Sequence, residues 1–297
     1  MDLRNIQTFI RAAELGSFTQ AANDLGYVQS TVTMQMQQLE KELGFPLFDR
    51  IGKRISLTTL GLAFLEYAYG ITRAMTEAAN LGKETTDIRG TLRVGVLESL
   101  LFGNMLQILP GFKEGFRNLD LQLKMGQASE LLQQLKENQL DMVYLSAGLN
   151  TDPDLRCCYK RREQLVFLCS PEHPVASKRG VTVKELLSYD FVVTERAGIC
   201  YRRLQELAQQ HNAMLHTSVE VDSTVAIAAL VQKNMALAFL PEYCVQSQLE
   251  SKILLRVDVD IEPQIYYSQI LYHKDRWESP FMAELIRQIQ AVRPESG

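Results

Sequence analysis

Features typical of membrane and secreted proteins are missing from this 297-residue sequence. No apolar run approaches the roughly 20 residues that a membrane-spanning helix needs, and there is no low-complexity tract. The first residues, MDLRNIQTF, contain no apolar segment of the kind found in secretion signals. We therefore expect a cytoplasmic protein without a membrane partner, whose length allows two or three compact domains.

Cysteine and histidine are few and scattered. The five cysteines form an odd set without C-x-x-C spacing, and the four histidines stand alone in the sequence. These absences argue against a disulfide framework and a Cys/His metal site, so we expect no metal or cofactor. P-loop, G-x-G-x-x-G and G-x-S-x-G motifs are also missing. An α/β enzyme is therefore the least supported alternative, and no residue is assigned as catalytic.

An excess of positive charge, a common sign of nucleic-acid affinity, is absent as well. The whole chain carries a formal net charge of -4, and its first 60 residues contain six cations and six anions. General electrostatic attraction to DNA is therefore not expected. Any affinity for DNA must come from the placement of a few cations against phosphates.

Apolar spacing predicts three helices near the N-terminus. The first, at about 2–15, ends at Gly16, and Ser17 is a good N-cap for the second, which ends before Gly26. The third is expected at about 29–43. Its core-facing stripe consists of Val32, Met36, Leu39 and Leu43. The short gap between the second and third helices is typical of a helix-turn-helix.

The other side of the third helix carries side chains that could read base edges. At about 100° per residue, the residues away from the core stripe are Ser30, Thr33, Met34 and Gln37, with Gln29 at the N-terminal end. Small, hydrogen-bonding or thin apolar side chains suit a major groove. A solvated helix face is the alternative, although such a face would normally contain more lysine and glutamate.

A basic hairpin is predicted directly after this helix. In RIGKRISLT, residues 50–58, the cations Arg50, Lys53 and Arg54 surround a turn between two extended pieces. Such a hairpin is typical of a wing whose cations meet phosphates or a minor groove. Three of the six cations of the first 60 residues are therefore concentrated in this hairpin, although the net charge of the segment is zero.

Residues 17–61, SFTQAANDLGYVQSTVTMQMQQLEKELGFPLFDRIGKRISLTTLG, resemble the winged helix-turn-helix of the LysR-type transcriptional regulators. The resemblance covers the first sixty residues without a gap, and it includes A-A-x-x-L, Q-S-x-V-T, L-E-x-E-L-G-x-P-L-F-x-R and L-T-x-x-G. It implies binding to double-stranded DNA. The expected contacts are Ser17, Thr19, Gln20, Gln29, Ser30, Thr31, Thr33, Met34, Gln37, Arg50, Lys53 and Arg54.

The sequence departs from the family pattern at two positions. Val28 replaces the serine or threonine usual before the glutamine, which removes an expected N-cap. Met34 stands where the family often has arginine, so we expect Met34 to lie against a thymine methyl group. Base contacts are therefore expected to depend on Gln29, Ser30, Thr33 and Gln37.

One long helix is predicted from about 58 to 88. Its apolar stripe contains Leu62, Leu65, Tyr69, Thr72, Met75 and Ala79. A helix between two domains has little of its own chain to cover such a stripe, so pairing with a second copy is favoured over packing on its own domain. In the resembling family this helix is the dimer seam. The resemblance also implies assembly into a tetramer and a contact with RNA polymerase.

The remainder of the chain alternates predicted strands and helices in two rounds of similar size. Strands are expected at 92–96, 119–125, 141–145, 164–169, 191–193, 218–221 and 236–240. Helices are expected near Ser99, Ser129, Thr182, Tyr201 and Thr224, with Ser129 as an N-cap. This alternation predicts a parallel sheet with covering helices. It resembles the two-lobed effector domain of the same family, which is similar to periplasmic binding proteins.

The expected fold class is therefore α+β overall, with three parts. A winged helix-turn-helix occupies 1–58, a linker and dimerisation helix 59–89, and a two-lobed α/β effector domain 90–297. Lobe I is expected at about 90–161 and 267–297, and lobe II at about 162–266.

Polar residues follow several of the predicted strands. In open α/β sheets, ligands bind beyond the carboxyl ends of strands, where helix N-termini offer free N–H groups. The candidate effector-binding residues are Ser99, Leu100, Gln127, Ser129, Thr194, Arg196, Ser223 and Thr224, and Glu195 follows the same strand as Thr194. In the resembling family the equivalents of Ser99, Ser129 and Ser223 or Thr224 line the effector cleft. For each residue alone, a helix cap is the alternative.

Cys200 offers a second hypothesis for sensing. It lies at a predicted helix start beside Arg196, Arg202 and Arg203, and such surroundings could lower the pKa of its thiol. Cys169 and Cys244 are expected in the core. A thiol-based redox sensor is therefore the alternative to our main prediction, a DNA-binding transcription regulator controlled by a small-molecule effector between the two lobes. The sequence leaves the effector and the target genes open.

Overall fold

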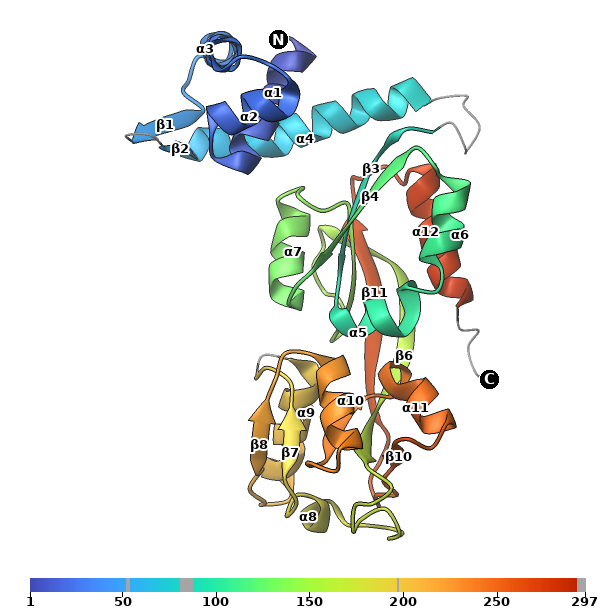
Figure 1. Ribbon diagram of the computed structural model, residues 1–297. Coiled ribbons are helices and arrows are strands. Elements are labelled where there is room, and N and C mark those ends of the chain that lie inside the picture. Colours follow the sequence, from blue (N-terminus) through green and yellow to red (C-terminus); the bar gives the residue numbers. More distant parts are fainter. Residues whose placement is uncertain (52–53, 81–87, 197, 293–297) are drawn as a thin grey trace. The chain divides into compact units, whose positions relative to one another are not determined.

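The computed structural model describes residues 1–51, 54–80, 88–196 and 198–292, which form two compact units (Figure 1). The N-terminal unit is Met1–Gly90 with Lys136–Gln139, and the C-terminal unit is Thr91–Leu135 with Leu140–Gly297. Within the described ranges, no helix is long and apolar enough to cross a membrane.

The N-terminal unit begins with three helices whose bounds match the prediction. They are α1 (Leu3–Leu15), α2 (Phe18–Leu25) and α3 (Gln29–Leu43). Each ends at a glycine with a positive φ, namely Gly16, Gly26 and Gly44, because only glycine adopts this geometry without a steric penalty. The Ser17 hydroxyl accepts a hydrogen bond from the Gln20 N–H at 3.3 Å, which confirms it as the N-cap of α2. Val28 gives α3 no side-chain cap.

The hairpin and one face of the next helix complete the core of this unit. β1 (Phe48–Ile51) and β2 (Arg54–Leu57) pair antiparallel, as predicted for a wing. The Phe9 ring lies 5.4 Å from that of Phe48 and 5.3 Å from that of Phe64, measured between centroids. Val32, Met36 and Leu39 of α3 are completely buried in the same cluster.

Two side chains and one glycine fix the connection between α3 and α4 (Thr59–Asn80). The Glu40 carboxylate accepts hydrogen bonds from the backbone N–H of Leu47 at 2.8 Å and of Phe48 at 3.3 Å. The Thr58 hydroxyl donates to the Pro46 carbonyl at 2.8 Å and accepts from the Gly61 N–H at 2.8 Å. A Cβ at Gly61 would lie 2.0 Å from the Leu47 carbonyl oxygen. These contacts explain the glutamate, threonine and glycine of the sequence motif.

The predicted apolar stripe of the long helix is partly wrong. Leu65 and Tyr69 are buried in the core of their own unit, and the Tyr69 hydroxyl donates to Glu14 at 3.0 Å. Leu62, Met75 and Ala79 of the predicted stripe are exposed. A second exposed apolar row consists of Leu60, Ala63, Tyr67, Ala74 and Ala78, with the half-buried Ile71. These residues recur at three- and four-residue intervals, the spacing of a coiled-coil seam. The predicted continuation of the helix through 81–87 lies outside the described residues.

The C-terminal unit contains one mixed sheet that extends through both lobes. Its strand order is β10-β6-β11-β5-β3-β4, with β9 also paired to β6. Its first strands are β3 (Gly90–Val96), β4 (Leu119–Met125) and β5 (Met142–Ala147), and β3 and β5 are parallel, as expected. The two long strands β6 (Leu155–Cys169) and β11 (Gln264–His273) are antiparallel to each other, and β11 is also antiparallel to β5.

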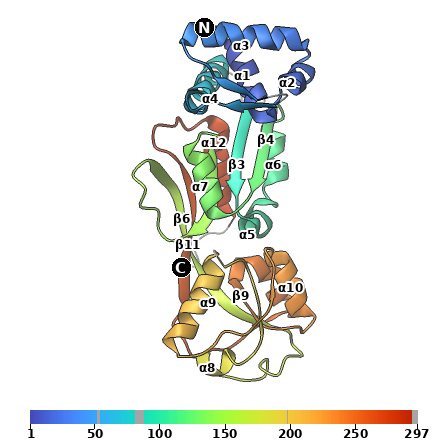
Figure 2. The same cartoon turned by 90° about the vertical axis from the view of Figure 1, so that its left-hand side faces the viewer.

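The prediction of a purely parallel sheet is therefore wrong. The charged first half of β6 and the whole of β11 show no clear apolar alternation, so neither was predicted as a strand. These two strands pass from one lobe to the other. Helix α12 (Pro280–Ala291), also unpredicted, packs beside α6 (Leu109–Gly115) on one side of the lobe I sheet, and α7 (Ala128–Lys136) lies on the other (Figures 1 and 2).

Helix starts in lobe I also differ from the prediction. Helix α5 (Glu98–Leu100) begins one residue before Ser99 and continues as a π-helical turn, Leu101–Met105. Helix α7 begins at Ala128, so Ser129 lies inside its first turn and the predicted N-cap role of Ser129 is wrong. The end of a strand can be read from its apolar run, whereas the first helical residue depends on local hydrogen bonds.

Lobe II follows the predicted order of elements as far as β9, and the later α11 and β10 were not predicted. The small parallel sheet of β7 (Phe191–Val193) and β8 (Thr217–Glu220) is accompanied by α8 (Val183–Leu186), α9 (Ile199–Gln210), α10 (Thr224–Gln232), β9 (Ala238–Pro241), α11 (Gln246–Glu250) and β10 (Leu255–Arg256). The Ser223 hydroxyl accepts from the Ala226 N–H at 3.1 Å, so Ser223 is the N-cap of α10. The lobe core is formed by buried aliphatic side chains of β6, β9 and α10.

The two glycines of α4 provide a matched test of this packing. Gly61→Ala should destabilise the protein by about 1–3 kcal/mol, because the new methyl group collides with backbone rather than with a movable side chain. A Cβ at Gly70 would meet no atom within 4 Å, so Gly70→Ala should stabilise by about 0.5–1 kcal/mol through helix propensity. Urea denaturation measures both changes, and equal effects would contradict the close approach of α4 to Leu47.

Candidate functional site

The first candidate site is the exposed side of α3. Gln29, Ser30, Met34 and Gln37 are exposed, and 62% of Met34 is accessible. Thr31 and Thr33 are half-buried, and the Thr33 hydroxyl donates to the Gln29 carbonyl at 3.1 Å. The Thr33 oxygen can therefore still accept a hydrogen bond, while its proton is already committed. The structure thus brings the predicted recognition residues together on one helix face.

The N-terminal ends of α2 and α3 complete this surface. Thr19 and Gln20 are exposed in the first turn of α2, and Ser17 is half-buried as its cap. Because Val28 provides no cap, the first backbone N–H groups of α3 lack a side-chain acceptor. Such uncapped N–H groups are well suited to a phosphate oxygen.

The basic residues of the wing are only partly described. Arg50 and Arg54 lie in β1 and β2, where Arg50 pairs with Ile55 and Arg54 with Ile51 through the backbone. Their side-chain positions, and Lys53 as a whole, lie outside the described residues. Arg11, by contrast, is engaged within the unit, since its guanidinium bonds to Asp24 at 2.6 Å and to Glu14 at 2.9 Å. These bonds lower the pKa of Asp24.

The second candidate site is a cavity of about 540 Å³ between the lobes of the C-terminal unit. Lobe I contributes the ends of β3, β4 and β5 with the starts of α5 and α7, and lobe II contributes the segments before α9 and α10. Figures 1 and 2 both show α5 facing α10 across this junction. We call this space the interlobe cavity. Its size is typical of small-molecule sites.

Six of the eight predicted effector residues line the interlobe cavity: Ser99, Gln127, Ser129, Thr194, Ser223 and Thr224. The other two do not. Leu100 is completely buried in the core of lobe I, and Arg196 is directed to Glu220, with its Nε 3.5 Å from Oε2. Leu100 is the last residue of the short α5 and faces the core, whereas Glu98 and Ser99 of the same helix line the cavity.

Hydrogen bonds between the lobes cross the cavity. The Glu98 carboxylate accepts from the Ser223 hydroxyl at 2.7 Å, from the Thr224 N–H at 2.7 Å and from the Thr224 hydroxyl at 3.2 Å. The Tyr243 hydroxyl lies 3.1 Å from that of Ser99 and 3.3 Å from that of Ser146. Burial raises the pKa of Tyr243 well above its ordinary value, so this phenol stays protonated and can donate one of these bonds.

The sequence did not single out several further residues of the cavity wall. They are Leu97, Glu98, Met125, Gly126, Ala128, Ser146, Gly198, Ile199, Asp222 and Pro241. Cys200 and Arg202, which the sequence singled out only for the redox hypothesis, also line the cavity. Glu98 and Asp222 directly precede predicted site residues at strand ends, so adjacency could have indicated both. Arg202 and Ser146 gave no such signal, because their approach to the cavity depends on how the lobes fold together.

Cys200 lies in an environment opposite to the one predicted. Its side chain is buried, and burial, followed by the negative charge of Glu195, raises the pKa of the thiol to about 12. A thiol with a raised pKa is a poor nucleophile near neutral pH. The prediction of a lowered pKa is therefore wrong, and the redox alternative loses its support. Cys169 is completely buried, as expected. Cys244, which was also expected in the core, is only half-buried.

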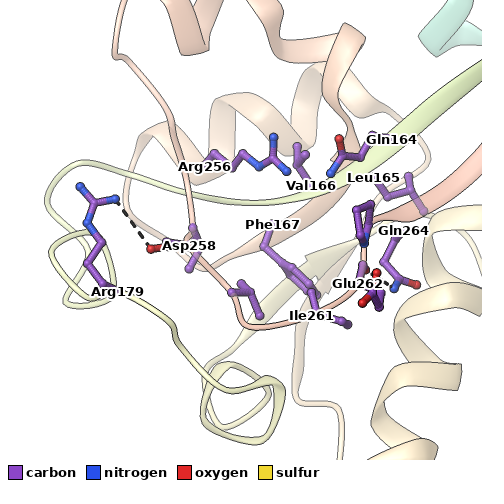
Figure 3. A pocket seen from close by; sticks show the side chains of 13 residues that line it. Gln164, Leu165, Val166, Phe167, Arg179, Arg256, Asp258, Ile261, Glu262 and Gln264 are labelled. Atoms are coloured by element: carbon purple, nitrogen blue, oxygen red, sulfur yellow. Dashed lines mark hydrogen bonds and ion pairs between the residues drawn. The ribbon is translucent and has the colours of Figure 1, made fainter.

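A second hollow of about 500 Å³ lies on lobe II beside β6 and β10 (Figure 3). On one side Arg179 faces Asp258, with Nη1 4.0 Å from Oδ2. On the other, the Gln264 amide donates to the Glu262 carbonyl at 2.8 Å. The hollow lies within lobe II, and none of the predicted effector residues lines it. In the described part of the chain, no cluster of His, Cys, Asp and Glu side chains could hold a metal ion.

Comparison with known families identifies both parts of the chain. Residues 3–62 match the family described as "Bacterial regulatory helix-turn-helix protein, lysR family", and residues 85–294 match the "LysR substrate binding domain". The chain belongs to the LysR family of transcriptional regulators. As a LysR-type protein it is a DNA-binding transcription regulator with an effector-binding domain, and the family consists of regulators rather than enzymes.

Individual LysR-type relatives cover almost the whole chain. The uncharacterized regulator YwqM of Bacillus subtilis is 30% identical over 94% of this chain and 95% of its own length. Regulator GltR of the same organism is 26% identical over 100% of both chains. Among solved structures, a full-length OxyR variant from Pseudomonas aeruginosa covers 100% of this chain and 99% of its own at a TM-score of 0.76 and 18% identity.

A further structure shows the same fold in the presence of DNA. Full-length CbnR complexed with its target DNA covers 99% of this chain and 100% of its own, with a TM-score of 0.65 and 19% identity. At this identity the likeness establishes the LysR-type fold and nothing finer. The substrate-binding-domain match implies a small-molecule effector for this LysR-type chain.

Glu195 should make the stability of the protein depend on pH. Burial, then the hydrogen bond and the charge of Asp222, raise its pKa to about 7, whereas an unfolded glutamate titrates near about 4.3. The folded state thus holds the proton more tightly than the unfolded state. The free energy of unfolding should therefore fall as the pH rises from about 4.3, the pKa of an unfolded glutamate, through about 7. Glu195→Gln cannot ionise, so it should be more stable than the parent at pH 8 and similar at pH 5.

Urea denaturation at several pH values between 5 and 8 measures this difference. Glu172→Gln, at an exposed position, controls for the loss of one carboxylate. A Glu195→Gln advantage that grows toward acidic pH would contradict the raised pKa.

Proposed function

We propose that this chain is a cytoplasmic, dimeric, sequence-specific regulator whose output at its promoter is set by a small molecule in the interlobe cavity. The observation that carries the proposal is the cavity itself, with polar side chains from both lobes on its wall. A ligand held by both lobes stabilises one arrangement of them over another. Such differential affinity is what allows a ligand to shift an equilibrium.

The DNA-reading part of the proposal rests on the exposed side of α3. Its Gln/Ser/Thr/Met composition offers donors, acceptors and one apolar side chain for base edges. The Thr8 hydroxyl bonds to Gln35 at 2.9 Å and positions α3 on α1, so this face is supported from behind. The uncapped start of α3 would hold a phosphate and set the helix in the groove.

Dimerisation rests on the exposed apolar side of α4. Tyr67 is 71% exposed and Leu60 51% exposed, although both stand on a helix whose other side is a well-packed core. Pairing with α4 of a second copy would cover this seam with coiled-coil spacing. The proposed LysR-type dimer would bind a two-fold symmetric operator. A tetramer and a contact with RNA polymerase are extensions of the same proposal.

Base reading and phosphate contact can be separated by mutation. Gln29→Ala should weaken operator binding at least about tenfold and leave random DNA nearly unchanged, because a base contact is worth about 1–3 kcal/mol of discrimination. Lys53→Ala should weaken binding to both DNAs and reduce the salt slope by about one. Fluorescence anisotropy at several salt concentrations measures both. Equal losses on the two DNAs for Gln29→Ala would show that another face of α3 reads the operator.

The seam on α4 predicts the effect of a buried charge. Tyr67→Arg should shift the protein from dimer toward monomer, since an unpaired guanidinium in an apolar interface costs several kcal/mol. Thr76→Arg places the same charge on another exposed side of the helix and is the control. Sedimentation equilibrium reports the mass of each variant. Dissociation by Thr76→Arg and not by Tyr67→Arg would place the interface elsewhere.

Filling the interlobe cavity tests the regulatory part. Ala128 lines the cavity, so Ala128→Phe should remove the response of DNA binding or transcription to a metabolite extract, while operator affinity without extract is retained. Ala291→Phe, at an exposed position at the end of α12, is the control for added apolar volume. An unchanged response in Ala128→Phe would contradict an effector in this cavity.

A further inference from the structure

The wall of the interlobe cavity has an unusual charge for a site at strand ends and helix starts. Three carboxylates line it, those of Glu98, Glu195 and Asp222, together with one guanidinium, that of Arg202. Helix N-termini at such an edge ordinarily attract anions. Here the surrounding side chains oppose that tendency. The wall is therefore better matched to positive charge than to negative charge.

The position most favourable to an anion is already taken by the protein. The Glu98 carboxylate occupies the N-terminus of α10, where it accepts from the Thr224 N–H at 2.7 Å and from both neighbouring hydroxyls. An anionic ligand would have to displace this internal carboxylate and would then lie beside it. Both steps are unfavourable, because the displaced Glu98 carboxylate loses its hydrogen-bond donors and because it repels the negative charge of the ligand.

A second group of polar residues on the cavity wall contains one atom without a partner among the described residues. The Thr194 side chain is only 8% exposed, and its hydroxyl has no hydrogen-bond partner among the described residues. Glu195 follows it directly and its carboxyl group bonds to that of Asp222. Buried polar groups without a partner are uncommon in native proteins. This group can accept hydrogen bonds from a ligand but offers few donors to one.

We propose that the interlobe cavity takes a small organic cation, whose ammonium group lies between the carboxylates of Glu195 and Asp222 and the hydroxyl oxygen of Thr194. An ammonium group has three donors and no acceptor, which suits three oxygen acceptors. Its apolar body would lie against Leu97, Met125 and Ile199, which also line the cavity. This assignment rests on the proposed function, because it names the chemical class of the effector.

The pair of carboxyls gives the site a pH signature. Binding of an ammonium group requires both Glu195 and Asp222 to be ionised, so affinity should increase as pH rises from 6 to 8. The other charged or titratable groups near the pair are Glu220 on β8 and Cys200 and Arg202 on α9. Glu220 is paired with Arg196 and Cys200 has a raised pKa, so neither is expected to reverse this trend.

Size-matched probes test the sign of the charge. The full-length protein would be titrated calorimetrically with 2-phenylethylamine, 2-phenylethanol and 3-phenylpropanoate. We expect the amine to bind most tightly, and Glu195→Gln and Asp222→Asn each to weaken it at least about tenfold, since a charge-assisted hydrogen bond contributes about 1.5–3 kcal/mol. Arg202→Gln should retain or strengthen amine binding. Tighter binding of the carboxylate, with its loss in Arg202→Gln, would overturn the proposal.

An extract separates this proposal from the proposed function. A metabolite extract would be divided on cation and anion exchangers, and each fraction tested for a rise in the melting temperature, which a ligand of the folded state must cause. We expect the activity in the cation-exchange fraction, lost in Glu195→Gln and Asp222→Asn. Activity in the anion-exchange fraction that Ala128→Phe removes would overturn the cationic ligand and leave the interlobe site intact. Activity that Ala128→Phe leaves unchanged would refute both.

Discussion

The bond between the Glu98 carboxylate and the start of α10 is the interaction on which the C-terminal unit depends. It joins a residue that follows a lobe I strand to the Ser223 hydroxyl and the Thr224 backbone N–H at the start of a lobe II helix. A carboxylate is favoured at a helix N-terminus by both hydrogen bonding and the helix dipole. The same bond closes one side of the interlobe cavity and removes its strongest anion site. One side chain thus links the two lobes and bears on the proposed ligand preference.

The N-terminal unit depends on the same kind of contact, a side chain that satisfies backbone groups at the end of an element. Glu40 accepts from two N–H groups before the wing, and Thr58 links the turn at Pro46 to the first turn of α4. Helix α3 lacks such a cap, and its start faces the proposed DNA surface. A group left unsatisfied in the free protein is available to a ligand. The same applies to the Thr194 hydroxyl in the interlobe cavity, which has no hydrogen-bond partner among the described residues.

Prediction from sequence succeeded where one residue type dictates local geometry, and it failed where distant strands decide. Glycine at a positive φ ends α1, α2 and α3, and Ser17 is the N-cap of α2 as predicted. Ser223, a predicted effector residue, also has the alternative role of a helix cap. The charged half of β6 and the strand β11 became strands because they pair with each other along their length. No period-2 apolar pattern marks them. The first half of β6 is largely exposed, whereas β11 is buried on both faces between its neighbours β6 and β5.

The sequence by itself determined the family, the bounds of the helix-turn-helix and six of the residues that line the cavity, because these depend on motifs and on the ends of local elements. Tertiary structure alone decided which charges face one another. Burial against Glu195 reversed the expected pKa of Cys200, and Glu220 drew Arg196 away from the cavity. It also buried Leu65 and Tyr69 of the predicted α4 stripe in the core of their own unit. Each of these outcomes depends on how side chains pack around the residue, which no local sequence pattern contains.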